Sequence, residues 1–219
     1  MKAQQLYFIE PHQVEIREQQ LPPLQPDQVL VKSLYSAISA GTEMLVYRGQ
    51  LPVAMSLDKS PTASHAQTIN YPTQYGYACV GRIVEVGQGV GADWVGKVVF
   101  SFQPHASHYV GALDEIIPLP EGVDPKDAVF LANMETAVNL VHDGNPRLGE
   151  RVVVLGQGIV GLLVSSVLAK FPLADLYAVE SIDGRRTLAA QAGVQATFSP
   201  QAESEISALQ EKLELNEVC

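Results

Sequence analysis

The hydrophobic pattern of the chain changes near residue 122. Before it, short apolar or alternating runs are separated by glycine and proline: 13–17 alternates polar and apolar positions, and β-branched residues recur in 79–86 and 98–102. Such alternation is typical of half-buried strands, and many short strands between Gly/Pro turns are typical of a barrel. We therefore predict a β-rich, barrel-like domain over residues 1–122.

After residue 122 the pattern changes to helices that alternate with short apolar runs. Asp124 and Pro125 are suited to cap and open a helix. Val152–Leu155 and Leu176–Val179 are apolar runs of strand length, and Ile159–Ala169 is an apolar stretch of helix length. Strands that alternate with helices predict a parallel sheet. The remaining predicted elements are a helix over 183–192, a strand over 196–198 and a helix over 203–215.

A glycine-rich loop joins the first of these strands to its helix. Its candidate cofactor-binding residues are Gly156, Gln157, Gly158, Ile159, Val160 and Gly161. We expect Gly156 to make the tight turn, Gly158 to let the backbone approach a pyrophosphate, and Gly161 to let helix and strand pack closely. Free N–H groups at the helix N-terminus would then face the phosphates. The alternatives are a glycine-tolerant structural turn and a methyltransferase loop, which usually follows a more acidic strand.

The residues after the second strand bear on the choice of cofactor. Glu180 follows Gly161 by 19 residues and ends this strand. A carboxylate there accepts hydrogen bonds from the adenosine ribose of NAD and repels the 2′-phosphate of NADP. Arg185 and Arg186 oppose this preference, since a guanidinium pairs well with phosphate. We predict a partial α/β Rossmann domain over 123–219 that binds NAD rather than NADP, with Glu180 and Arg185 as cofactor contacts.

Composition and charge limit the partners. The formal net charge is −10 and no basic cluster exceeds a pair, so we expect no nucleic-acid and no membrane partner. The N-terminus lacks the apolar core of a signal peptide, and the apolar stretch 159–169 is shorter than the ~20 residues that span a bilayer. The two cysteines form no C-x-x-C pair, which leaves no disulfide framework. We expect a soluble, cytoplasmic protein.

Motifs along nearly the whole chain resemble one enzyme superfamily. They are AISAGTE (37–43), YGYACVGRIVEVG (75–87), GKVVF (96–100), METAVNLVHDG (134–144) and the dinucleotide-binding unit. In this order they resemble the medium-chain dehydrogenase/reductase superfamily, which includes the zinc-type alcohol dehydrogenases. Within it, AISAGTE and YGYACVG resemble the bacteriochlorophyllide and threonine dehydrogenase-like branch. The resemblance implies a GroES-like β-barrel catalytic domain over 1–122, a Rossmann domain after it, and an active site between the two.

The resemblance also bears on metal binding. The family holds its catalytic zinc with the cysteine of C-G-T-D and the histidine and glutamate of G-H-E, whereas these positions are Ala40, Tyr77 and Ala78 here. A methyl group and a phenol cannot replace a thiolate and an imidazole as zinc ligands. We therefore predict no catalytic zinc, and we expect the two histidines of PHASH to lie in a solvated turn. The alternative is a different metal site, built from His105, His108 and Glu135.

Members of this family continue well beyond residue 219, and that continuation forms the second half of the Rossmann sheet. Without it, the strand Val152–Leu155 has a neighbour on one side only. Such an apolar edge invites self-association. A fragment, a truncated gene product and one part of a split enzyme all stay open as explanations.

The implied chemistry is hydride transfer between a nicotinamide cofactor and an alcohol or carbonyl substrate. Without zinc, another group must stabilise negative charge on the substrate oxygen. Thr42, at the family's hydroxyl relay position, and the phenol of Tyr77 are the candidates; a turn role for Thr42 and barrel packing for Tyr77 are the alternatives. Glu43 is expected to pair with a basic neighbour such as Arg48. The rival function is a truncated, non-catalytic module that binds a nucleotide or a partner protein.

Overall fold

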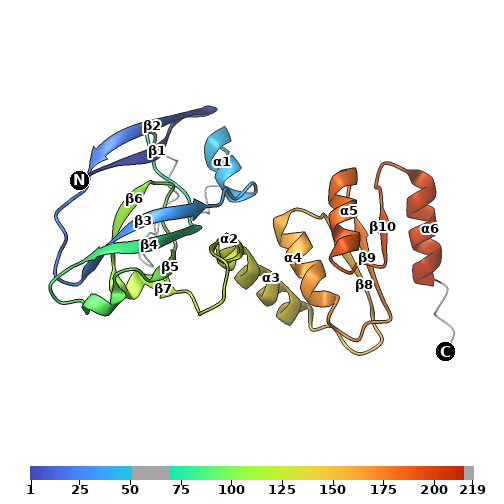
Figure 1. Ribbon diagram of the computed structural model, residues 1–219. Coiled ribbons are helices and arrows are strands. Elements are labelled where there is room, and N and C mark those ends of the chain that lie inside the picture. The colour runs from blue at the N-terminus through green and yellow to red at the C-terminus, as the bar shows by residue number, and fades with distance from the viewer. Residues whose placement is uncertain (51–69, 215–219) are drawn as a thin grey trace. The chain divides into compact units, whose positions relative to one another are not determined.

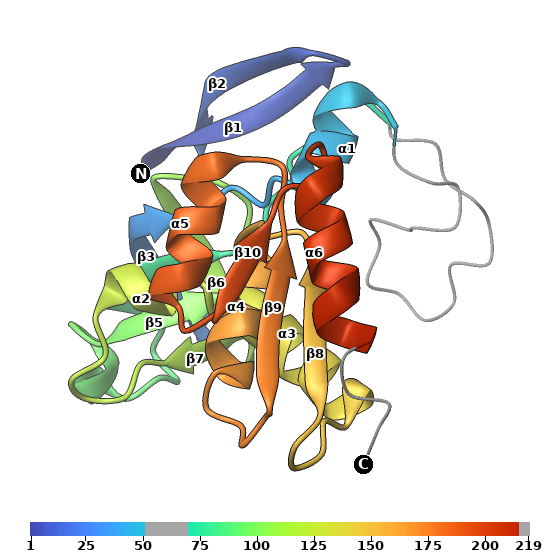
Figure 2. The same ribbon diagram turned by 90° about the vertical axis from the view of Figure 1, so that its right-hand side faces the viewer.

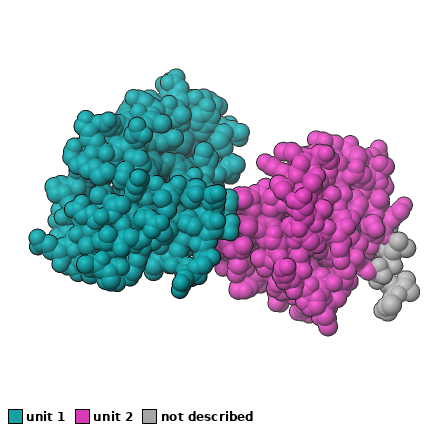
Figure 3. All heavy atoms as spheres, viewed as in Figure 1, with its two compact units in different colours: residues 1–131 teal, residues 132–219 magenta. Residues whose placement is uncertain are grey.

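The structure is a computed structural model that describes residues 1–50 and 70–214. The chain forms two compact units, residues 1–131 and residues 132–219 (Figure 3). The division falls after Leu131 rather than at residue 122, because a short helix, α2 (Pro125–Ala128), packs against strands of the first unit. Asp124 caps this helix as predicted, accepting a hydrogen bond of 2.8 Å from the backbone N–H of Lys126.

Unit 1 consists mainly of antiparallel strands (Figure 1). They are β1 (Lys2–Glu10), β2 (Gln13–Gln20), β3 (Gln28–Ser36), β4 (Cys79–Val86), β5 (Val98–Ser101), β6 (His108–Ala112) and β7 (Ile116–Pro118). The sheet order is β6-β3-β4-β5-β7, and β1 and β2 form a separate hairpin. The unit also contains α1 (Thr42–Arg48) and two 3₁₀ turns, Ala92–Trp94 and Leu113–Glu115. The predicted β-rich domain is confirmed.

Alternating apolar positions build the core of this sheet. On β3, Val29 and Val31 are fully buried, and they pack with Cys79 and Ile83 of β4 and Val99 of β5. Residues two apart on a strand point to the same face, so each strand contributes a row of side chains to one core. Leu30, between Val29 and Val31, is buried on the other face with Ala3 and Leu21. The alternating run 13–17 in β2 is not half-buried as predicted, because Val14 is 51% exposed and Ile16 is 67% exposed.

The β1–β2 hairpin is attached to the rest of unit 1 along β1. Leu6 donates its N–H to the carbonyl of His105 at 3.0 Å, and Phe8 exchanges two backbone hydrogen bonds with Thr73. A two-stranded hairpin is only marginally stable alone. These contacts hold its inward side chains beside α1 and the segment that carries His105.

Unit 2 is a parallel sheet with helices on both faces (Figure 2). Its elements are α3 (Leu131–Gly144), β8 (Arg151–Leu155), α4 (Ile159–Leu168), β9 (Asp175–Val179), α5 (Asp183–Gln191), β10 (Ala196–Phe198) and α6 (Glu203–Glu214). On β9, Leu176 and Ala178 pack in one cluster with helices α4 and α5, while Tyr177 packs on the other face with Leu209 of α6. The predicted partial Rossmann fold is confirmed.

The sheet order is β10-β9-β8, which puts β8 at an edge of the described sheet. This agrees with the expectation that the strand has a neighbour on one side only: Val152–Val154 are only partly buried and Leu155 is 78% exposed. The reason is that β8 pairs with β9 alone within residues 132–214. In the part of the chain that the structure describes, no helix has the length and hydropathy needed to cross a membrane.

Candidate functional site

The glycine-rich loop of unit 2 has a geometry that only glycine permits at two positions. Gly156 has φ of +85°, in the left-handed region that favours glycine. A Cβ on Gly161 would lie 2.0 Å from the carbonyl oxygen of Gly156, so any side chain there would separate α4 from β8. The conformational roles predicted for these two glycines are thus seen in the structure.

Gly158 differs from its two neighbours in the motif. It is the N-cap of α4, its φ is −68°, and a Cβ built on it meets nothing within 4 Å. The backbone here therefore borders open space at a helix N-terminus. The first N–H groups of a helix have no acceptor within it and favour an anion. This part of the loop leaves room for an anion, and its binding to a pyrophosphate stays a prediction.

Glu180 lies directly after β9 and is bonded to the glycine loop. Its Oε2 accepts the N–H of Gln157 at 2.7 Å, and its Oε1 accepts the N–H of Ile182 at 2.9 Å and the hydroxyl of Ser181 at 3.1 Å. The residue is only 5% exposed. The bond to Gln157 spans 23 residues and was not predicted, since the sequence suggested only a ribose contact.

Burial and hydrogen bonding act in opposite directions on this carboxyl. Burial alone would raise the pKa of Glu180, but the N–H groups of Ile182 and Gln157, the Ser181 hydroxyl and the Arg185 guanidinium together lower the pKa below its ordinary value. The carboxylate is therefore charged at neutral pH. It carries a negative charge at the place where a dinucleotide-binding fold meets the ribose.

The two arginines of α5 have different environments. Arg186 donates to the Glu180 carbonyl at 2.8 Å and to Asp183 at 3.0 Å. Arg185 lies 3.8 Å from the Glu180 carboxylate, and its side chain is 45% exposed. Arg185 is thus the arginine with its guanidinium more accessible to solvent, and its contact with a cofactor stays a prediction.

Gln157 contributes its backbone rather than its side chain to this loop. The side chain is fully buried, and its Oε1 accepts the hydroxyl of Ser165 in α4 at 3.0 Å. Its Nε2 has no hydrogen-bond partner among the described residues. A cofactor contact by the Gln157 side chain would therefore require this buried packing to open.

In unit 1, the structure places the predicted residue Thr42 at the start of α1 and Tyr77 just before β4. Both side chains are partly buried. Tyr77 packs edge-to-face against Tyr75, with ring centroids 6.2 Å apart. Burial is the main cause of the raised pKa of Tyr75, and the nearby phenol of Tyr77 and charge of Glu43 add to it. These residues therefore share one neighbourhood.

The predicted partner of Glu43 was wrong. Its carboxylate, 3% exposed, pairs with His105 rather than Arg48, with 2.7 Å between Oε2 and Nε2. Its Oε1 accepts the N–H of Ser39 at 2.9 Å. Side chains five residues apart on a helix do not face each other, so Glu43 points inward while Arg48 is exposed.

His105 is not in a solvated turn, contrary to expectation. Its side chain is 12% exposed, and its Nδ1 is hydrogen-bonded to the hydroxyl of Ser36 at the end of β3. Gly76 has φ of +140°, and a Cβ there would lie 3.0 Å from Nε2 of the ring. Glycine at this position leaves room for the imidazole beside the segment that carries Tyr77.

The three residues considered for an alternative metal site each have other partners. Nδ1 of His108 lies 3.3 Å from the Ser107 hydroxyl, and burial followed by the charge of Lys32 lowers the pKa of His108. Glu135 accepts a hydrogen bond from Asn139 within α3. Across residues 1–50 and 70–214 no group of three or more His, Cys, Asp or Glu side chains is arranged to hold a metal ion.

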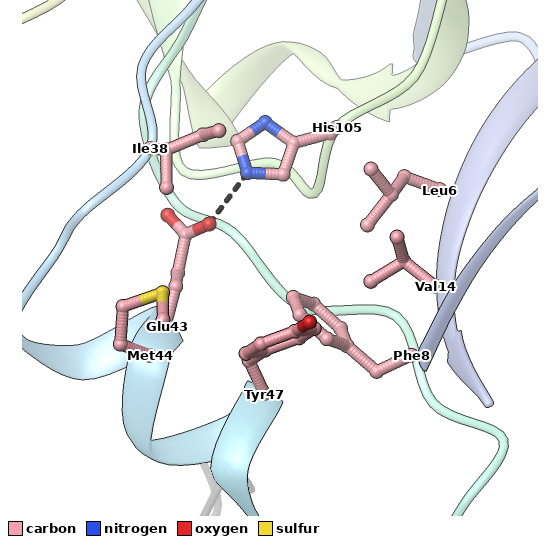
Figure 4. A pocket seen from close by; sticks show the side chains of 8 residues that line it. All are labelled: Leu6, Phe8, Val14, Ile38, Glu43, Met44, Tyr47 and His105. Carbon is pink, nitrogen blue, oxygen red and sulfur yellow. Dashed lines mark hydrogen bonds and ion pairs between the residues drawn. The ribbon is translucent and has the colours of Figure 1, made fainter. Parts of the chain in front are cut away.

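A pocket of about 180 Å³ lies beside the Glu43–His105 pair (Figure 4). Its walls are Leu6, Phe8, Val14, Ile38, Met44 and Tyr47, together with Glu43 and His105. The walls come from the hairpin, from α1 and from two loops, so sequence patterns could not assemble them. An apolar pocket of this size suits a small apolar group.

No family model matches the sequence. Among curated relatives, the L-threonine 3-dehydrogenase of Caldanaerobacter subterraneus subsp. tengcongensis is 26% identical over 230 residues, which cover 91% of this chain and 62% of that protein. The D-xylulose reductase A of Aspergillus oryzae is 34% identical over 105 residues, covering 48% of this chain and 28% of that protein. The chain thus spans less than two thirds of the length of either relative.

Solved structures share the fold. One described as a short chain alcohol dehydrogenase from Escherichia coli CFT073, complexed with NADH, has a TM-score of 0.77 and 21% identity, over 96% of this chain and 66% of that one. The 2R,3R-butanediol dehydrogenase of Bacillus subtilis has a TM-score of 0.77 and 20% identity, over 96% of this chain and 67% of that one.

The fold shared with these structures is an antiparallel β domain followed by the first half of a Rossmann-type domain. The relatives place it more narrowly. Together they indicate the medium-chain dehydrogenase/reductase superfamily of zinc-type alcohol dehydrogenase-like proteins, which the sequence motifs also resemble.

Proposed function

We propose that this protein is an oxidoreductase that transfers hydride between a nicotinamide dinucleotide and an alcohol or carbonyl substrate. The glycine loop supports the proposal most directly. It has a left-handed Gly156, open space in front of Gly158, and α4 beginning directly behind it. A merely structural turn would not need open space at the N-terminus of the helix.

The residues present fit the dinucleotide. The pyrophosphate would lie at the N-terminus of α4, and Glu180 and Arg185 would flank the adenosine ribose. Because Glu180 is charged and already fixed in place, we propose NAD rather than NADP. When bound, the nicotinamide ring supplies the acceptor or donor of the hydride.

The residues present do not fit a catalytic zinc. Ala40 and Ala78 offer no ligand atom, and Tyr77 offers only a phenol. We propose instead that Tyr77 and Thr42 hydrogen-bond the substrate oxygen through their hydroxyl groups. Such donors are worth most where negative charge develops in the transition state.

The dinucleotide site is tested by titrating the protein with NADH and NADPH and following nucleotide fluorescence. We expect saturable binding with NADH preferred. Gly158→Val should weaken NADH binding at least about tenfold, because its side chain occupies the open space without a clash inside the protein. Gly144→Val is the matched control, since a Cβ there also meets nothing within 4 Å. Equal affinity of both variants and the wild type would remove the loop from cofactor binding.

The phenol of Tyr77 is tested by Tyr77→Phe, measured as turnover of NADH with alcohol and carbonyl substrates. Loss of one donor to the developing oxyanion should lower kcat by roughly a hundredfold and leave the affinity for NADH nearly unchanged. Tyr75→Phe is the control, because its ring packs against Tyr77. An unchanged kcat in Tyr77→Phe would leave Tyr77 with a packing role only.

The second candidate is a nucleotide-binding or partner-binding module without catalysis, favoured by the apolar side chains of Ala40 and Ala78. Both candidates predict NADH binding. Substrate-dependent turnover of NADH by the wild type separates them, because only the oxidoreductase shows it.

A further inference from the structure

Unit 1 contains a hydrogen-bonded chain of three side chains that the sequence did not predict. It runs from the hydroxyl of Ser36 through both nitrogens of the His105 ring to the carboxylate of Glu43. Figure 4 shows the last link, between His105 and Glu43, at the wall of the pocket. The three residues come from the end of β3, from a loop and from α1, so tertiary folding alone brings them together.

Burial increases along this chain. Ser36 is exposed, the His105 side chain is 12% exposed and the Glu43 side chain is 3% exposed. Among the residues that the structure describes, His105 is the only basic side chain within 4 Å of the Glu43 carboxylate. The hydrogen bonds therefore connect solvent at Ser36 with the buried carboxylate of Glu43 through the imidazole of His105.

The partners determine which ring nitrogen carries hydrogen. A carboxylate can only accept, so Glu43 assigns the hydrogen to Nε2 of His105. Nδ1 is then free to accept the proton of the Ser36 hydroxyl. A carboxylate on one ring nitrogen and a hydroxyl on the other is the arrangement that makes an imidazole a directed proton acceptor.

The hydrogen-bonded chain comes from segments that also carry the residues proposed to hold the substrate oxygen. Glu43 follows Thr42 directly in α1, and Gly76, which borders the His105 ring, precedes Tyr77. The titratable groups that face the pair are Tyr75, from the segment before β4, and Tyr47, from α1; Tyr77 lies against Tyr75.

We infer that His105 is the proton acceptor of the alcohol oxidation, that Glu43 orients it, and that Ser36 passes the proton. This inference rests on the proposed function. The substrate loses a hydride to the dinucleotide and its hydroxyl proton to Ser36 Oγ, while the Ser36 proton moves to Nδ1 of His105. A C=O bond forms, and the imidazolium that results faces the Glu43 carboxylate. The proton leaves to solvent through exposed Ser36, and carbonyl reduction runs the same path backwards.

The variant His105→Gln tests proton transfer by His105 while keeping the hydrogen bonds that the residue makes. A glutamine amide can still donate to Glu43 and accept from Ser36, but it cannot hold an extra proton. We expect kcat to fall by 10²- to 10⁴-fold, the range typical of lost acid–base catalysis, with KM and NADH affinity within about threefold.

In His105→Gly, added imidazole should restore a measurable part of kcat. His108→Gln is the matched control, because His108 bonds to Ser107 outside this chain, and its kcat should not change.

A second measurement does not depend on turnover. Nitrogen-15 NMR of the imidazoles should show hydrogen on Nε2 of His105 and none on Nδ1, and Ser36→Ala should shift the Nδ1 signal. Hydrogen on Nδ1 overturns the inference, as does a wild-type kcat in His105→Gln or failure of imidazole to restore His105→Gly. Absence of any alcohol- or carbonyl-dependent turnover in the wild type overturns the proposed function itself, and the inference with it.

Discussion

At the scale of single residues, Glu180 has two tasks. It accepts hydrogen bonds from the N–H groups of Gln157 and Ile182, and so ties the glycine loop to the end of β9. Each carboxylate oxygen has two lone pairs, so acceptor capacity remains for a ribose hydroxyl. The charge proposed to repel a 2′-phosphate would therefore be the same charge that holds the loop in place.

This double role makes a specific prediction for Glu180→Ser with Arg185 retained. Removing the carboxylate leaves an exposed guanidinium beside the ribose position, so the NADPH-to-NADH affinity ratio should rise by about tenfold, the order of one charge-assisted contact. Both affinities should fall, because the N–H of Gln157 loses its acceptor. The ratio, measured by fluorescence titration, is the test.

The control for this experiment is the double variant Glu180→Ser/Arg185→Ala, in which the loop is loosened but the guanidinium is absent. Its affinity ratio should return towards that of the wild type. A ratio unchanged in the single variant would mean that Glu180 does not face the ribose.

At the scale of elements, the strand–loop–helix unit β8–α4 depends on the close approach of two backbones. Gly161 lies so near the Gly156 carbonyl that a methyl group does not fit. Gly158 lies three residues earlier in the same loop and has open space at its Cβ position. One motif therefore contains one glycine that close packing requires, Gly161, and one that packing does not require, Gly158, for which we propose a role in cofactor binding.

Gly161→Ala should accordingly destabilise unit 2 by about 1–3 kcal/mol, the usual range for overpacking. Gly158→Ala should change the free energy of unfolding by less than about 0.5 kcal/mol, as for an ordinary surface change. Urea denaturation of the two variants measures both values. Similar losses in both would show that close packing at Gly161 does not govern the stability of the unit.

At the scale of the whole molecule, the outstanding feature is the edge of the parallel sheet. β8 consists of Val152–Val154 between Arg151 and Leu155, and within the described sheet it pairs only with β9. An apolar strand edge offers unpaired N–H and C=O groups to another chain. Self-association through β8 remains a prediction, and it can be tested at one exposed position.

Leu155→Lys should reduce concentration-dependent association in sedimentation velocity, because a charge on an edge strand opposes pairing. Leu155 is 78% exposed, so the change should not disturb the fold. Leu148→Lys is the control: Leu148 is 82% exposed but lies before the strand. A wild-type chain that stays monomeric at all concentrations, or an equal effect of both variants, would contradict association through this edge.

Much of the fold was accessible from sequence because its causes are local. The cap at Asp124 and the left-handed Gly156 each depend on residues within a few positions of one another. The glycine spacing also indicated the cofactor site, since the turn, the close packing and the helix N-terminus all lie within six residues.

Long-range contacts were decided only by the tertiary structure. Glu43 and His105 are 62 residues apart, and Ser36 and His105 are 69 apart. No periodicity links positions that far apart, so the sequence suggested the nearby Arg48 as a partner and a solvated turn for His105. The one-sided pairing of β8 was expected only through the family resemblance, because an apolar run predicts a strand but not the number of strands that pair with it. Local patterns therefore determined the elements and the phosphate loop, whereas the packing of distant segments created the Ser36–His105–Glu43 chain and its pocket.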